Sequence, residues 1–125
     1  MAGRTVCILL AEDDRDTLKV FSRLLRHHGY VVHSATSVAE AKALAAENQC
    51  DLVISDLGLS DGSGETLMRD LKKQYGLKGL AVSGYAMPDD LAAAQTAGFD
   101  RFLSKPVEFS HLLDTIRELT DGLVS

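Results

Sequence analysis

Residues 5–14 read TVCILLAEDD, an apolar run that ends in three consecutive acids. The run over residues 5–11 is apolar almost throughout, which is typical of a strand buried on both faces of a parallel sheet. Glu12, Asp13 and Asp14 follow at the point where such a strand leaves the sheet. Ligands of open α/β sheets bind at the carboxyl ends of the strands, so these acids are candidate functional residues.

Four more apolar runs of strand length follow and alternate with segments of helical spacing. The further candidate strands are residues 30–35, 51–56, 80–83 and 99–104. Ser37 and Ser63 suit helix N-caps, Pro88 suits a first helical turn, and Gly29 and Gly98 suit helix ends. Five strands alternating with five helices predict an α/β domain with a parallel sheet.

Length and composition narrow the class of protein further. The 125 residues suit a single domain over residues 1–125. The net charge of −5, without a basic run, argues against direct binding of nucleic acid. No apolar run reaches bilayer length and no signal-peptide pattern is present, so we expect a cytoplasmic domain without membrane insertion. Cys7 and Cys50, which form no C-x-x-C motif, are predicted to be reduced packing residues.

Residues with acidic, hydroxyl or amino side chains lie at or just after the ends of four predicted strands. Glu12 and Asp13 follow the first strand, Asp56 ends the third, Ser83 ends the fourth, and Lys105 follows the fifth. If the first and third strands are neighbours, three carboxylates converge and repel one another unless a cation lies among them. Such an all-oxygen site suits Mg²⁺ or Mn²⁺. A carboxylate can also accept a phosphoryl group, with an ammonium and a hydroxyl group to stabilise the transferred oxygens.

Each of these residues also has an ordinary explanation. Acids after a strand stabilise the next helix N-terminus, Asp56 and Ser83 suit turns, and a lysine before proline is usually solvated. Their joint placement at four strand ends is hard to explain by turn chemistry. The pattern therefore favours a functional site.

The motifs ILLAEDD, DLVISDLGLSDGSG, AVSGYA and FLSKPV occur in this order, and with them the chain resembles a receiver domain of two-component response regulators. The resemblance extends from Thr5 to about Thr120. It implies a doubly wound, five-stranded parallel sheet of order 2-1-3-4-5 flanked by five helices, a flavodoxin-like three-layer sandwich.

The resemblance also implies roles for individual residues. Asp56 matches the phosphoacceptor of the family. Asp13 matches the acid that binds Mg²⁺ (or Mn²⁺) directly, Glu12 matches its partner, and the backbone carbonyl of Gly58 matches the group that completes the metal site.

Three further positions match the family motifs. Ser83 corresponds to the hydroxyl residue that moves to hold the phosphoryl group, and Phe102 to the switch aromatic. Lys105 corresponds to the invariant lysine, and its peptide bond with Pro106 is cis in the family.

The implied function is a phosphorylation-dependent switch. Asp56 receives a phosphoryl group from a sensor histidine kinase or a phosphotransfer protein, and the domain itself catalyses transfer and dephosphorylation. A downstream effector then binds the face formed by helix 4, strand 5 and helix 5, through which the family often dimerises. A stand-alone regulator and a receiver of a hybrid histidine kinase both remain open, and DLGLSDGSGETLMRDL looks more like the hybrid receivers.

The chain departs from the family at three positions. Ser60 stands where the family usually has proline, which we expect to loosen the loop. Gly58 lacks the side chain that often tunes dephosphorylation in the family, and Tyr85 stands at the family's other tuning position.

Three other functions are compatible with parts of this pattern. A phosphohydrolase of the haloacid dehalogenase type would carry an acid at position 58 and a cap domain. A flavodoxin-like mononucleotide binder would have a Ser/Thr/Gly-rich loop in place of residues 12–14. A receiver used only for docking, without phosphorylation, stays open.

Overall fold

The computed structural model describes residues 5–84 and 87–121, and its centre is a five-stranded sheet. All neighbouring strands in this sheet are parallel. They stand in the order β2-β1-β3-β6-β7. Their bounds are β1 (Cys7–Ala11), β2 (Val31–Ala35), β3 (Leu52–Asp56), β6 (Lys78–Ser83) and β7 (Arg101–Ser104). The predicted order 2-1-3-4-5 is confirmed, with β6 and β7 as the fourth and fifth strands.

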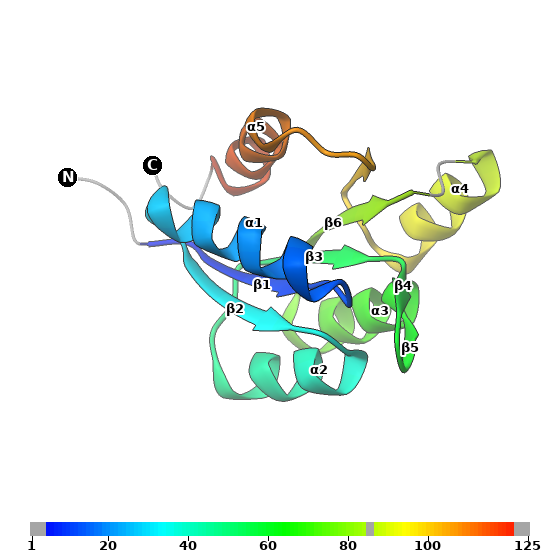
Figure 1. Cartoon of the computed structure of the whole chain (residues 1–125). Coiled ribbons are helices and arrows are strands. Elements are labelled where there is room, and N and C mark those ends of the chain that lie inside the picture. Colours follow the sequence, from blue (N-terminus) through cyan, green and yellow to red (C-terminus); the bar gives the residue numbers. More distant parts are fainter. Residues whose placement is uncertain (1–4, 85–86, 122–125) are drawn as a thin grey trace.

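Helices cover both faces of the sheet, which makes the fold a three-layer sandwich (Figure 1). α1 (Arg15–His27) and α5 (Phe109–Thr120) contribute to the core on one face. α2 (Val38–Glu47), α3 (Gly64–Tyr75) and α4 (Pro88–Ala97) contribute to the core on the other face.

The strands serve both cores because alternate side chains point to opposite faces. In β1, Ile8 and Leu10 pack on the side of α1 and α5, while Leu9 and Ala11 pack on the other side. Ile8 and Leu9 are both fully buried. This two-sided burial is what the unbroken apolar run of the sequence predicts.

The predicted helix signals lie where the helices begin and end. The Ser37 hydroxyl accepts a hydrogen bond from the Glu40 N–H at 3.1 Å, and Ser63 caps α3 through the Thr66 N–H at the same distance. Gly98 ends α4 with a φ of +113°, in the left-handed region that favours glycine. Within residues 5–84 and 87–121, no helix combines the length and apolar character that a membrane span requires.

All five strands end at the predicted residues, but each begins one or two residues away from its predicted start, and two of these differences show why. The fifth strand begins at Arg101, because the N–H of Phe99 donates to the Ala94 carbonyl at 3.1 Å and so belongs to the end of α4. The fourth strand begins at Lys78, which pairs with Leu52 of β3. Both differences follow from backbone pairing that side-chain hydropathy does not report.

A short antiparallel hairpin, which the sequence analysis does not anticipate, follows β3. It consists of β4 (Gly58–Leu59) and β5 (Gly62–Ser63). The hairpin begins two residues after Asp56 and connects the carboxyl end of β3 to the first turn of α3.

The tip of this hairpin is tied to the start of α2. The Asp61 carboxylate accepts hydrogen bonds from the backbone N–H groups of Val38 at 2.7 Å and Ala39 at 3.0 Å. The Ser60 hydroxyl lies 3.5 Å from the Thr36 carbonyl oxygen. Asp61 therefore anchors the tip of the loop that Ser60 was expected to loosen. No sequence pattern singles out Asp61 for this role.

Candidate functional site

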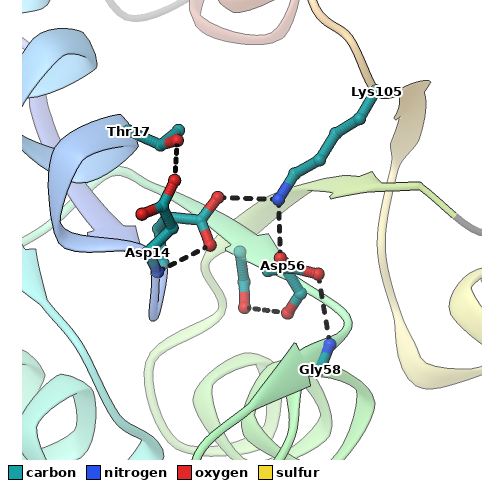
Figure 2. Close-up of polar contacts among 7 residues, drawn as sticks. Asp14, Thr17, Asp56, Gly58 and Lys105 are labelled. Atoms are coloured by element: carbon teal, nitrogen blue, oxygen red, sulfur yellow. Dashed lines mark hydrogen bonds and ion pairs between the residues drawn. The ribbon is translucent and has the colours of Figure 1, made fainter.

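An ion-paired cluster lies at the carboxyl edge of the sheet, where β1, β3 and β7 end (Figure 2). The Lys105 ammonium group donates to Asp56 Oδ2 at 2.7 Å and to Glu12 Oε1 at 2.8 Å. In the sequence, Lys105 lies 49 positions after Asp56 and 93 positions after Glu12. The parallel sheet brings them together because the carboxyl ends of its strands share one edge.

The backbone around the cluster holds the carboxylates in place. Asp56 Oδ1 accepts from the Gly58 N–H at 3.2 Å, and Glu12 Oε2 accepts from the Asp14 N–H at 3.3 Å. The backbone N–H of Lys105 donates to the Ser83 carbonyl at 2.9 Å. Both carboxylates are thus fixed from two sides, by the lysine and by a backbone donor.

Burial and charge shift two pKa values in the cluster. Burial, assisted by the nearby Asp56 charge, raises the pKa of Glu12, although the hydrogen bond from Lys105 opposes this. Burial alone would lower the pKa of Lys105, but its hydrogen bonds and charge interactions with Asp56 and Glu12 outweigh that effect and raise it. Lys105 is therefore a firmly charged ammonium group at neutral pH.

The acids can also hold a metal ion. Glu12, Asp13 and Asp56 each offer a carboxylate oxygen, and these oxygens lie within 4.8 Å of one another. Glu12 is buried and Asp13 is exposed, so the cluster is open to solvent on one side. Oxygen ligands with room for water fit Mg²⁺ or Mn²⁺, as the sequence analysis expects.

The remaining expected site residues lie on the neighbouring strands. Ser83 is buried at the end of β6, opposite Ser104 of β7. Phe102 is half-buried on β7 and packs against the core on the α4 side. The peptide bond between Lys105 and Pro106 is cis, the isomer that the resemblance implies. Tyr85 lies outside the described residues.

Two residues behind Asp56 were not singled out from the sequence. The Ser55 hydroxyl donates to the Asp56 carbonyl at 2.7 Å. A Cβ at Gly64 would lie only 2.1 Å from the same carbonyl oxygen. No sequence signal identifies these residues, because a buried Ser and a Gly at a helix start are common for many reasons.

Beside the cluster lies a largely apolar cavity of about 480 Å³. Its walls come from α1, the strand ends and the segment after Lys105, including Phe21, Val107 and Leu112. Asp56, Glu12 and Lys105 form its polar end. The Asp56 carboxylate thus has an apolar surface on one side and the solvent-facing Asp13 nearby.

Residues 8–117 match the family model described as the response regulator receiver domain. That match covers most of the chain, and the protein therefore belongs to this family and is a receiver domain of two-component signalling.

Curated relatives include both a kinase and a small regulator. Sensor kinase CckA of Brucella abortus is 34% identical over 120 residues, which cover 91% of this chain and 12% of the kinase. The polar-differentiation response regulator DivK of Brucella ovis is 29% identical over 116 residues, which cover 90% of this chain and 94% of DivK.

Solved structures agree with this assignment. The crystal structure of a CheY-like response regulator receiver domain protein from Methanospirillum hungatei matches with a TM-score of 0.90 and 30% identity. The match covers 96% of this chain and 97% of that one.

Proposed function

We propose that this receiver works as a phosphorylation-dependent switch in which Asp56 accepts a phosphoryl group from a phosphohistidine. The phosphohistidine belongs to a sensor histidine kinase or a phosphotransfer protein. The observation that carries the proposal is the Lys105 ammonium group, which contacts Asp56 at 2.7 Å within a cluster of three acids.

In the transfer step, a carboxylate oxygen of Asp56 attacks phosphorus and forms an acyl phosphate. The bond between phosphorus and the imidazole nitrogen breaks, and the imidazole leaves with the electron pair of that bond. Lys105 contributes positive charge beside the phosphoryl oxygens throughout. Water later attacks phosphorus, the bond between phosphorus and the Asp56 oxygen breaks, and inorganic phosphate leaves the restored carboxylate. The same residues of the domain thus catalyse both transfer and dephosphorylation.

The acid cluster supplies the ligands for a divalent ion. Glu12, Asp13, Asp56 and the backbone carbonyl of Gly58 would hold Mg²⁺ or Mn²⁺, which offsets negative charge on the phosphoryl oxygens.

The response to phosphorylation passes from Ser83 to Phe102. The Ser83 hydroxyl moves toward the phosphoryl oxygens, and the Phe102 ring turns inward into the space this opens. The face formed by α4, β7 and α5 then shifts toward a conformation that binds a downstream effector or a second copy. This is a population shift between two existing states.

We further propose that residues 1–125 form one receiver domain that works in the cytoplasm. The similarity to DivK supports a stand-alone regulator, whereas the similarity to CckA supports a receiver attached to a kinase. The chemistry at Asp56 is the same in both cases.

The test is the intact mass of the protein after incubation with acetyl phosphate and Mg²⁺. We expect one phosphoryl adduct, which is lost with EDTA and in Asp56→Asn. Asp51→Asn, which changes the acid at the opposite end of β3, is the matched control and keeps the adduct.

The phosphoryl adduct could hydrolyse before the mass is measured. Beryllofluoride, which mimics the acyl phosphate without hydrolysing, serves as the probe in that case. An adduct on Asp51→Asn but not on Asp56→Asn supports the proposal. Failure of both acetyl phosphate and beryllofluoride to bind the unmodified protein would leave a receiver used only for docking.

A further inference from the structure

The two cysteines meet at the end of the sheet opposite the carboxylate cluster. Cys7 is the first residue of β1, and Cys50 precedes β3 by two residues. β1 and β3 run side by side in Figure 1 and are parallel, so their first residues share one end of the sheet and their last residues the other. The two cysteines therefore lie at the end opposite Glu12 and Asp56. The Cys7 thiol donates a weak hydrogen bond to the Cys50 sulfur, with the two sulfurs 3.7 Å apart.

The backbone at this end of the sheet suits a covalent link between the cysteines. Asp51 pairs with Cys7 through two hydrogen bonds of 2.8 Å, from Asp51 N–H to the Cys7 carbonyl and from Cys7 N–H to the Asp51 carboxylate. With Cys50 one residue beyond this pair, strand spacing and rise place the two cysteine Cα atoms about 6 Å apart. Disulfides span Cα separations of about 4.4–6.8 Å, so the bond needs side-chain rotation and no displacement of the strands.

A small oxidant can reach only one of the two sulfurs easily. Cys7 is buried, whereas Cys50 is half-buried and lines a cavity of about 580 Å³ together with Asn48, Gln49 and Tyr75. Burial, with the adjacent Cys7 as a second cause, raises the pKa of Cys50 to about 12. Cys50 is therefore mostly a thiol at neutral pH, and we expect slow oxidation that accelerates as the pH rises.

We propose that Cys7 and Cys50 form a reversible intramolecular disulfide when the protein meets a peroxide. The Cys50 sulfur attacks one oxygen of hydrogen peroxide, the O–O bond breaks, and water leaves with a sulfenic acid on Cys50. The Cys7 sulfur then attacks the Cys50 sulfur, the S–O bond breaks, and a second water leaves. The two thiols lose two electrons to the peroxide, and their two protons end in the two waters.

The disulfide ties β1 to the chain that enters β3 and closes a loop across 43 positions. This loop contains α1, β2 and α2. Closing it restricts the unfolded chain, so we expect the oxidised protein to melt at a temperature higher by roughly 10 °C. The carboxylate cluster lies at the far end of the strands, and we expect phosphoryl acceptance to be unchanged.

The experiment treats the full chain with excess hydrogen peroxide and follows intact mass, thiol titration under denaturing conditions and melting temperature. We expect the loss of two hydrogens, the disappearance of both titratable thiols, and a Cys7–Cys50 linked peptide after digestion. A dithiol reductant should reverse all three changes and return the melting temperature to its starting value.

Cys50→Ser is the matched variant, because its position is half-exposed and tolerates the change better than buried Cys7. Its melting temperature should not rise with peroxide. The proposal is overturned if both thiols of the unmodified protein remain titratable, if only oxygen-bearing adducts form, or if the disulfide joins two copies. Acetyl phosphate labelling of the reduced and oxidised forms separates the two proposals. If neither form is labelled, the proposal for Asp56 fails, and the disulfide proposal is still decided by the thiol titration.

Discussion

The Asp61 carboxylate accepts a hydrogen bond of 2.7 Å from the backbone N–H of Val38, across 23 positions of sequence. This contact joins the tip of the hairpin that follows Asp56 to the first turn of α2. The unpaired N–H groups and positive dipole end of a helix N-terminus favour a carboxylate at this point. The loop that follows Asp56 is therefore held by a helix that contributes no residue to the acid cluster.

Replacing Asp61 by Asn should lower the melting temperature in a pH-dependent way. The hydrogen bonds from Ala39 and Val38 lower the pKa of Asp61 below its ordinary value of 3.8. Its stabilising contribution is thus present above pH 3.8 and is lost as the pH falls through the lowered pKa. Thermal melts at neutral and acidic pH measure this.

Ser60→Ala is the control for Asp61→Asn, because the Ser60 hydroxyl makes only a marginal contact of 3.5 Å. The difference between Asp61→Asn and the unmodified protein should shrink at acidic pH. Equal melting temperatures at neutral pH would show that the anchor contributes nothing to the fold.

Gly64→Ala should both destabilise the protein and displace the end of β3, which carries Asp56. The added Cβ would lie 2.1 Å from the Asp56 carbonyl oxygen, so the end of β3 or the start of α3 must move. We expect the free energy of unfolding to fall by about 1–3 kcal/mol. Gly58→Ala is the control, because the added Cβ meets nothing within 4 Å. In chemical denaturation, Gly64→Ala should have a clearly lower free energy of unfolding than Gly58→Ala.

Lys105→Ala should slow phosphorylation without removing the acceptor. The variant loses the ammonium group that contacts both Asp56 and Glu12, and with it a positive charge beside the transferred oxygens. Loss of one such preorganised group costs roughly 10²-fold in rate. Lys72→Ala is the matched control, because Lys72 also pairs with a carboxylate, that of Asp100, but outside the cluster. Similar acetyl phosphate labelling rates for both variants would argue against a role for Lys105.

Asp13→Asn should weaken binding of Mg²⁺, measured by isothermal titration calorimetry. Asp13 is the exposed member of the acid cluster, and its replacement removes one of three negative charges. Loss of an outer-shell partner already costs roughly 10–100-fold in metal affinity, so we expect loss of a direct ligand to cost at least as much. Asp16→Asn, which changes an acid of the first turn of α1, is the control and should bind as before. Unchanged affinity in Asp13→Asn would place the ion elsewhere.

The strands, the helices and the family could be predicted from the amino-acid sequence. Local periodicity identified five strands and five helices, and capping residues such as Ser37 and Ser63 placed the helix starts. The residues now seen at the cluster could also be named in advance, since each follows or ends a strand. These features are readable because they depend on neighbours a few positions apart.

The contacts between residues distant in the sequence could not be predicted in the same way. The hairpin after Asp56, the anchoring of Asp61 at α2, the close packing of Gly64 on the Asp56 carbonyl and the contact between Cys7 and Cys50 were all unforeseen. Each depends on strand register and on how helices lie over the sheet. Those are set by the packing of the whole core, which no local pattern of residues specifies.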